Sequence, residues 1–221
     1  MSGFVLQFAN GTWLTVQTAV CALVIGLILG IAGATAKLSS SYALRFLAGF
    51  LTTVIRGIPE LLVLFFVYFG GTLLLTALWG SYAEINAFIA GAFALGLLFA
   101  AYATEVLRGA VLAIPRGQFE AAQAFGFRPW QTFWYIMLPQ TIRHGLPGLS
   151  NLWLVLLKDT ALISLIGEAD IMRVAQNITS LTRQPFTFYL SAAVLYLGLT
   201  TLSLIGQHYI TKHYIGEARY G

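Results

Sequence analysis

Five ionisable side chains lie within otherwise apolar stretches of this 221-residue sequence, and they are the residues that could do chemistry. They are Arg56, Glu60, Glu105, Lys158 and Asp159. A charge in an apolar segment is costly, so it usually faces a cavity or a partner of opposite charge. Carboxylates in such positions can bind a cationic ligand group. Glu60 and Asp159 are therefore the first candidates for a ligand path.

Ion pairs that hold helices in register would explain the same residues. Lys158 could pair with the carboxylate beside it or with one on a partner chain, or it could meet a ligand carboxylate. Glu105 and Arg108 are three residues apart, on one helical face, which favours a structural pair. Pro59 and Thr160, which flank charged residues, complete the set of path candidates.

The residues typical of enzymes are missing from the sequence pattern. His144, His208 and His213 have no metal-ligand spacing, and no nucleophile stands beside a base and an orienting group. There is no glycine-rich phosphate-binding loop, so any ATP must be hydrolysed by another protein. Cys21 has no second cysteine and is interpreted as a core residue. We expect no catalytic residue, metal or cofactor in this chain.

The composition indicates that lipid is part of the solvent. The sequence is 58% hydrophobic and only 9% charged, whereas soluble domains carry about 25% charged residues. A helix of roughly 20 apolar residues crosses a bilayer, and the apolar stretches lack the alternation of barrel strands. We predict an all-α, polytopic membrane protein, a single domain over 1–221. Its five transmembrane helices are expected at about 13–36, 47–79, 85–107, 147–167 and 187–210.

The second predicted span is ambiguous because it is too long for one straight crossing. Gly57 and Pro59 lie inside it, and proline removes a backbone donor and kinks a helix. Either the helix is long, tilted and bent, or 42–55 lies near the interface and the crossing begins near Gly57.

Glycines recur at three- and four-residue spacing in the first predicted span, at Gly26, Gly30 and Gly33. This spacing places them on one helical face, where small residues let another helix approach closely. We expect that face to pack against a second span.

Lysine and arginine are distributed unevenly between the two sides that five spans define. If the N-terminus is outside, and Arg56 and Lys158 within the spans are left out, eight lie inside and two outside. The inside set is Lys37, Arg45, Arg108, Arg116, Arg128, Arg143, Lys212 and Arg219, and the outside set is Arg173 and Arg183. Positive residues favour the cytoplasmic side, so we expect a periplasmic N-terminus and a cytoplasmic C-terminus. The net charge of +4 is then a topology signal, and nucleic-acid binding is not expected.

The longest connection, 108–146, lies on the cytoplasmic side in this scheme. Gln118–Phe125 favours a helix, Gly126 suits a left-handed helix end, and Trp130–Leu138 favours a second helix that Pro139 closes. The segment is predicted to form a helix, a glycine turn and a helix.

The first helix of this loop has features of a docking surface. Ala121, Ala122 and Ala124 would give a small, smooth surface that another protein can approach closely, and exposed aromatic residues suit a partner groove. Glu120, early in the helix, favours the helix dipole. An amphipathic helix that merely lies on the membrane is the alternative.

The same loop carries a family pattern. The run Glu120-Ala121-Ala122, then Gly126, then Ile136, Leu138 and Pro139, resembles the EAA loop of bacterial ABC-importer permeases. Glycine stands six residues after the glutamate, and nine residues separate it from Ile-x-Leu-Pro, as in the family.

The likeness extends over nearly the whole chain. Arg56-Gly57-Ile58-Pro59-Glu60-Leu61 resembles a segment of polar amino acid permeases, and Lys158-Asp159-Thr160-Ala161-Leu162 is similar to another, with alanine where serine is commoner. The chain is most similar to Q-type permeases for histidine, lysine, arginine and ornithine, or for octopine and nopaline.

This resemblance implies a type I ABC importer permease fold with a cytoplasmic coupling loop at 108–146. It also implies a set of partners: a cytoplasmic ABC ATPase dimer carrying ATP and Mg, a second permease subunit, a periplasmic solute-binding protein, the lipid bilayer and an amino-acid substrate. The substrate would be a polar, in particular basic, amino acid or an opine. Glutamine or glutamate stays open, as does a homodimer against a heterodimer of permeases.

Two other classes of membrane protein fit the sequence less well. An ion-coupled secondary transporter would need no such loop, and many of these folds contain paired inverted repeats, which five spans do not suggest. A membrane enzyme would present clustered catalytic groups at one face.

Overall fold

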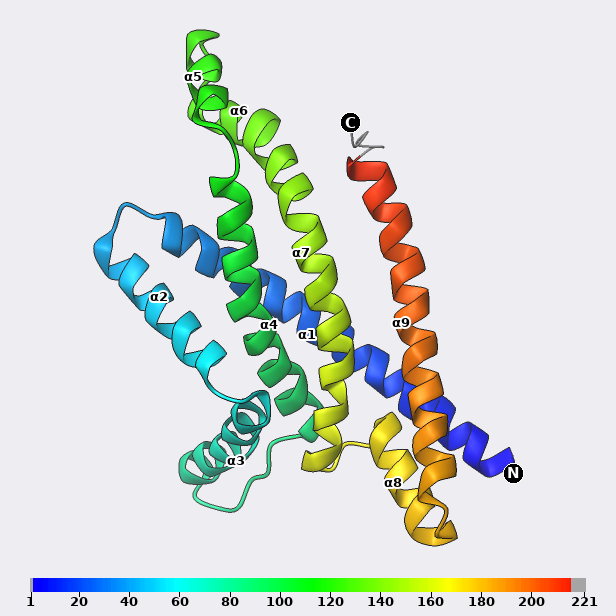
Figure 1. Ribbon diagram of the computed structural model, residues 1–221. Helices are drawn as coiled ribbons and strands as arrows, with labels where there is room; N and C mark the ends of the chain where they lie inside the picture. Colours follow the sequence, from blue (N-terminus) through cyan, green and yellow to red (C-terminus); the bar gives the residue numbers. More distant parts are fainter. Residues whose placement is uncertain (1, 216–221) are drawn as a thin grey trace.

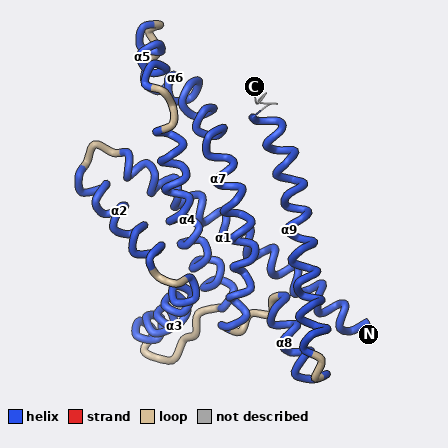
Figure 2. Tube along the Cα trace, in the orientation of Figure 1, coloured by secondary structure: helices blue, strands red, loops and turns tan. Residues whose placement is uncertain are grey.

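The computed structural model describes residues 2–215, with side chains for 3–212, and every element within that range is a helix (Figures 1 and 2). Arg219 and the side chain of His213 lie outside the described part. In chain order the elements are α1 (Ser2–Leu38), α2 (Tyr42–Gly57), α3 (Glu60–Trp79), α4 (Ala87–Leu112), α5 (Arg116–Ala124), α6 (Pro129–Thr132), the π-helix η1 (Phe133–Met137), α7 (Leu138–Asp159), the 3-10 helix η2 (Thr160–Ile166), α8 (Ile171–Thr182) and α9 (Pro185–Ile215).

Within residues 2–215, five helical stretches are long and apolar enough to cross a membrane, which confirms the predicted number. They are Gly3–Leu38, Glu60–Trp79, Ala87–Leu112, Pro129–Ile166 and Pro185–Lys212. The first begins near the N-terminus rather than at 13, because nothing in the intervening sequence stops the helix.

The second predicted span is divided into two helices at Ile58 and Pro59. Ile58 is extended, with φ −97° and ψ 137°, as expected for a residue that precedes proline. Pro59 has φ −54° and ψ 136° and precedes the first residue of α3. The chain therefore bends sharply here, and α3 turns away from α2 (Figure 1).

The centre of the fold is the contact between α1 and α4. A Cβ on Gly26 would lie 2.6 Å from Cδ1 of Phe99, and one on Gly30 would lie 2.9 Å from Cβ of Ala103. The Thr104 hydroxyl donates to the Gly30 carbonyl at 3.3 Å. The glycine face predicted for the first span is therefore a close helix–helix contact.

The loops gather at two ends of the molecule (Figure 1). Residues 38–41, α5, α6 and the end of α9 lie at one end, and the start of α1, residues 80–86 and α8 lie at the other. The relative sidedness of the loops thus agrees with the predicted order of crossings.

Pro139 does not close a helix, contrary to the prediction. Helical structure continues from Pro129 through η1 into α7, where Pro139 lies in the first turn. The π-turn widens the backbone, since the N–H of Leu138 donates to the carbonyl of Phe133, five residues back. A turn that already departs from the α-helical pattern can accept a residue without an N–H donor. The α-helix ends at Asp159, and helical structure continues as η2 to Ile166, close to the predicted end of the span at 167.

Helix α8 was not predicted. Asp170 caps it, with its side chain accepting the N–H of Arg173 at 2.9 Å. Its buried residues are Ile171, Val174, Ala175 and Ile178. An acidic N-cap before apolar residues at helical spacing is the signal that could have identified this helix.

Candidate functional site

Two of the predicted path residues, Glu60 and Asp159, line the same small pocket between α3, α4 and α7. Glu60 is the first residue of α3 and Asp159 the last of α7, so two helix ends bring the carboxylates together. Tyr102 of α4 supplies the third polar group. The remaining wall is apolar and consists of Leu95, Leu98, Phe99, Leu152, Val155 and Leu156. Apolar walls strengthen the attraction between these carboxylates and a cation.

Arg56 lies next to this pocket. Its guanidinium carbon is 5.1 Å from the centroid of the Tyr102 ring, a cation–π contact between α2 and α4. Tyr102 thus links a positive group to the pocket with two carboxylates. A ligand carrying both an ammonium and a carboxylate group would find complementary charges here.

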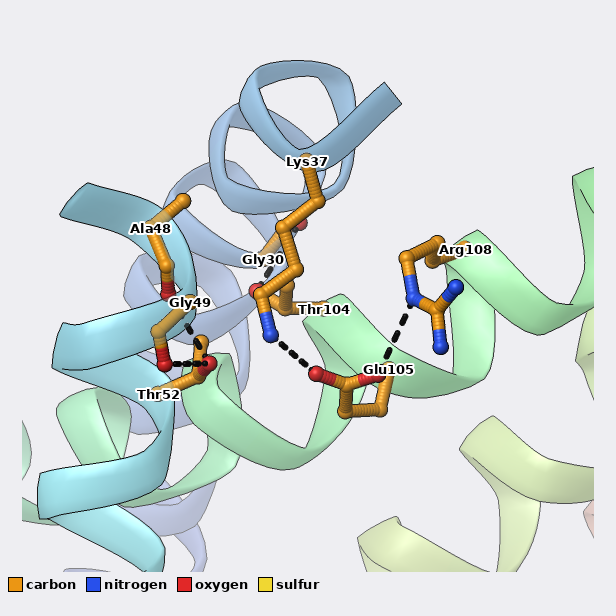
Figure 3. Close-up of polar contacts among 8 residues, drawn as sticks. All are labelled: Gly30, Lys37, Ala48, Gly49, Thr52, Thr104, Glu105 and Arg108. Atoms are coloured by element: carbon orange, nitrogen blue, oxygen red, sulfur yellow. Dashed lines mark hydrogen bonds and ion pairs between the residues drawn. The ribbon is translucent and has the colours of Figure 1, made fainter. Parts of the chain in front are cut away.

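Glu105 has structural partners instead. It forms an ion pair with Lys37 at the end of α1, and its Oε2 accepts from Nε of Arg108 at 3.1 Å (Figure 3). The Lys37 side chain is 12% exposed and the Glu105 side chain 25%, so this ion pair is largely shielded from water. It fixes α1 to α4 beside the Thr104–Gly30 hydrogen bond.

The other path candidates lie outside the pocket wall. Lys158 is exposed, and it has no ion pair within residues 3–212. Thr160 is fully buried and donates its hydroxyl to the carbonyl of Leu157 at 2.7 Å. Pro59 forms the bend before α3. The structure therefore brings together Glu60 and Asp159, with Arg56 nearby, but not the whole predicted set.

The segment from α5 to α6 folds as the predicted helix, glycine turn and helix. Gly126 has φ +75°. The N–H of Phe127 donates to the carbonyl of Ala122 at 3.0 Å, and that of Gly126 to the carbonyl of Gln123 at 2.9 Å. This pair of bonds is a Schellman motif. On the far side, the Gln131 side chain accepts the N–H of Arg128 at 2.9 Å.

The surface of this elbow, residues 116–139, differs in one respect from the prediction. Ala122 is 1% exposed and packs inside the elbow, so it is not part of a smooth outer surface. Glu120, Ala121 and Ala124 are exposed. The elbow has a first arm, α5, and a second arm, α6 with η1. Ile136 and Leu138 are partly buried, where the second arm joins α7. Large aromatic side chains are also exposed, namely Phe125, Trp130, Trp134 and Tyr135.

The fold and the site define a polytopic helical membrane protein with charged residues at the meeting point of its helices and a protruding elbow at one end. Residues 22–215 match the model of the family described as binding-protein-dependent transport system inner membrane component. The chain belongs to this family.

Curated relatives cover nearly the whole chain. The octopine transport system permease protein OccQ of Rhizobium meliloti is 48% identical over 206 residues, which are 91% of this chain and 87% of that protein. The arginine ABC transporter permease protein ArtQ of Haemophilus influenzae is 46% identical, covering 93% and 92%.

Solved structures agree with this assignment. An amino acid ABC transporter with histidines matches with a TM-score of 0.85 and 32% identity, over 96% of both chains. The MetNI methionine ABC transporter, at 17% identity and a TM-score of 0.78, shares the fold over 97% of this chain and 99% of its own.

Family membership makes this chain the permease subunit of an ABC importer, a multi-pass inner-membrane protein that is not itself an enzyme. Permeases of this kind work with an ATPase and a second permease subunit.

Proposed function

We propose that this permease forms the path for an amino acid with a cationic side chain, or for an opine, and that the pocket between Glu60 and Asp159 binds it. The carrying observation is that two carboxylates from separate helix ends share one apolar-walled pocket. The carboxylates attract the cationic end of the substrate, while Arg56 attracts its carboxylate. This substrate class is supported by the relatives of the chain, which include permeases named for octopine, nopaline and arginine transport.

Direct uptake tests the proposal. Proteoliposomes would contain the permease complex with its ATPase and solute-binding protein, and radiolabelled arginine, histidine and glutamine would be compared. Glu60→Gln and Asp159→Asn should each raise the KM for arginine, whereas Lys158→Gln, outside the pocket, serves as the matched control. Preferred uptake of glutamine would favour the alternative substrate, and uptake driven by an ion gradient without ATP would contradict the importer mechanism.

We also propose that the elbow couples the permease to the ATPase from the cytoplasmic side. Glu120, Ala121 and Gly126 stand in its first arm and turn, while Ile136, Leu138 and Pro139 join its second arm to α7. The exposed aromatic residues suit a groove on a partner, and Ala122 contributes by packing the elbow itself. Because α6, η1 and α7 are continuous, a displacement of the elbow would reach Asp159 at the far end.

The basic residues support a periplasmic N-terminus and cytoplasmic elbow. Substituted cysteines at position 121 and position 181, in a Cys21→Ala background, would test this in right-side-out vesicles. A membrane-impermeant maleimide should label the second and not the first. The reverse result would place the elbow in the periplasm and overturn the coupling proposal.

A further inference from the structure

Four polar side chains meet in a buried cluster where α1, η2, α8 and α9 come together. Asp170, Thr15 and Thr160 are each 0% exposed, and the hydroxyl of Tyr196 lies beside all three. Within the part of the chain that the structure describes, neither Oδ2 of Asp170 nor the Tyr196 hydroxyl makes a hydrogen bond. Buried polar atoms without partners are costly, so this cluster needs an explanation beyond packing.

The backbone around the cluster is tightly held. A Cβ on Gly11 would lie 3.1 Å from the backbone of Asp170, so α1 passes close to the start of α8. The N–H of Ile171 donates to the Thr15 hydroxyl at 3.4 Å. Asp170 Oδ1 is already occupied by the N–H of Arg173. Among the described residues, Oδ2 of Asp170 has no hydrogen-bond partner and is free to respond to the groups around it.

Few hydroxyl hydrogens in the cluster are available for donation to Asp170. The Thr15 hydroxyl donates to the carbonyl of Gly11 at 2.9 Å, and the Thr160 hydroxyl donates to that of Leu157 at 2.7 Å. Both threonine oxygens can thus only accept. The single hydrogen of Tyr196 faces three acceptors: the two threonine oxygens and the Asp170 carboxylate.

Thr160 follows Asp159 directly in the chain, and Asp159 lines the pocket proposed above. We propose that Asp170 and Tyr196 are positioning residues that set, through Thr160, where Asp159 lies in that pocket. This inference rests on the proposed function and extends it to residues that do not touch the substrate.

The protonation state of Asp170 decides where the Tyr196 hydrogen goes. Ionised Asp170 is the strongest acceptor, because hydrogen bonds to a charged oxygen are stronger, and it draws the hydroxyl away from Thr160. Protonated Asp170 donates to the Tyr196 oxygen instead, and Tyr196 can then donate to Thr160. Burial raises the pKa of Asp170 to about 6, which places this change near neutrality.

The side chains that face Asp170 from the neighbouring helices carry no charge. Tyr196 comes from α9, Thr15 from α1 and Thr160 from η2, and all three are uncharged hydroxyls. Arg173, on α8 itself, contacts Asp170 through its backbone N–H. Glu168 is the other acid nearby, and burial also raises its pKa, so it supplies a control.

The test measures the KM for arginine uptake by the complete transporter at about pH 5 and about pH 7, one unit on either side of the Asp170 pKa of about 6. The native KM should rise with pH by about fivefold, the size expected for one hydrogen bond. Asp170→Asn, which donates as protonated aspartate does, should keep the low KM at both pH values. Tyr196→Phe should give the high KM at both, with Vmax unchanged.

Tyr189→Phe on the same helix and Glu168→Gln should keep the native pH dependence. The inference is overturned if Asp170→Asn and Tyr196→Phe also keep it, or if Vmax alone falls. If Asp170→Asn fails to assemble, the result for Tyr196→Phe decides the test, because this substitution removes a single oxygen atom and otherwise keeps the shape of the side chain. If instead Glu60→Gln and Asp159→Asn leave KM unchanged, the pocket itself is wrong, which is a separate failure.

A readout without transport uses the reactivity of a pocket cysteine. In a Cys21→Ala background, Asp159→Cys would be labelled with a charged maleimide at fixed pH. Tyr196→Phe should change the labelling rate about fivefold, and Tyr189→Phe should not. Equal rates in all three proteins would refute the positioning role.

Discussion

Substitution of Gly126 by valine tests the backbone conformation of the elbow without changing its side-chain packing. Gly126 has φ +75°, and among the described atoms none lies within 4 Å of the position its Cβ would take. The added side chain therefore meets open space, and the cost is confined to the backbone. A left-handed conformation costs an L-residue about 1–2 kcal/mol, and a β-branched residue adopts it least readily. The folded elbow should then lose a factor of about 5–30 in population relative to unfolded turns.

The assay is arginine uptake per ATP hydrolysed in proteoliposomes that contain the partner ATPase. Gly126→Val should lower this ratio strongly, and Gly126→Asn should lower it less, because asparagine tolerates the left-handed region. Gly117→Val, in the first turn of α5 with open space around its Cβ and no positive φ, is the matched control. A native ratio in Gly126→Val, or an equal loss in Gly117→Val, would refute the reasoning.

Three further predictions concern the packed helices. Gly26→Leu should destabilise the solubilised protein by about 1–3 kcal/mol, seen as a fall in Tm, because its side chain would overlap Phe99; an unchanged Tm would contradict the close contact. Glu105→Gln leaves the largely buried Lys37 without its partner and should cost about 3 kcal/mol, and adding Lys37→Met should restore part of the lost Tm. The pKa of Asp170 is raised from 3.8 to about 6, so folding favours its protonated form. The free energy of unfolding should therefore be greatest below about pH 4 and fall by about 3 kcal/mol as the pH rises through 6. Asp170→Asn should remove that pH dependence of Tm.

The sequence could predict the spans because their signal is local. Charge-free stretches, the glycine face of the first span and Gly126 each correspond to what the structure contains. The bend at Pro59 was also predictable, since proline restricts the residue before it. The same rule about proline gave the wrong prediction that Pro139 closes a helix. A π-turn, which lets the helix continue there, leaves no clear pattern in the sequence.

The site was only partly predictable. Glu60 and Asp159 are about a hundred residues apart in sequence, and nothing local says that their helix ends meet. The spacing of Glu105 and Arg108 favoured a structural pair, which the structure contains, but the additional ion pair of Glu105 with Lys37 at the end of α1 was not predicted. Asp170 and Tyr196 were not predicted as functional residues, because the cluster that they form exists only where four helices pack together. The pairing of distant residues is set by packing, which a single sequence does not display.

The interlocked faces of α1 and α4 impose an order on biogenesis. Their glycines and alanines can be covered only after both helices are in the bilayer, yet α2 and α3 leave the ribosome between them. Synthesis from Leu38 to Leu112 takes about 4–15 s at typical rates. During that interval the narrow face of α1 is surrounded by lipid or held by the insertion machinery, so the first stable core of this protein forms only when its fourth helix arrives.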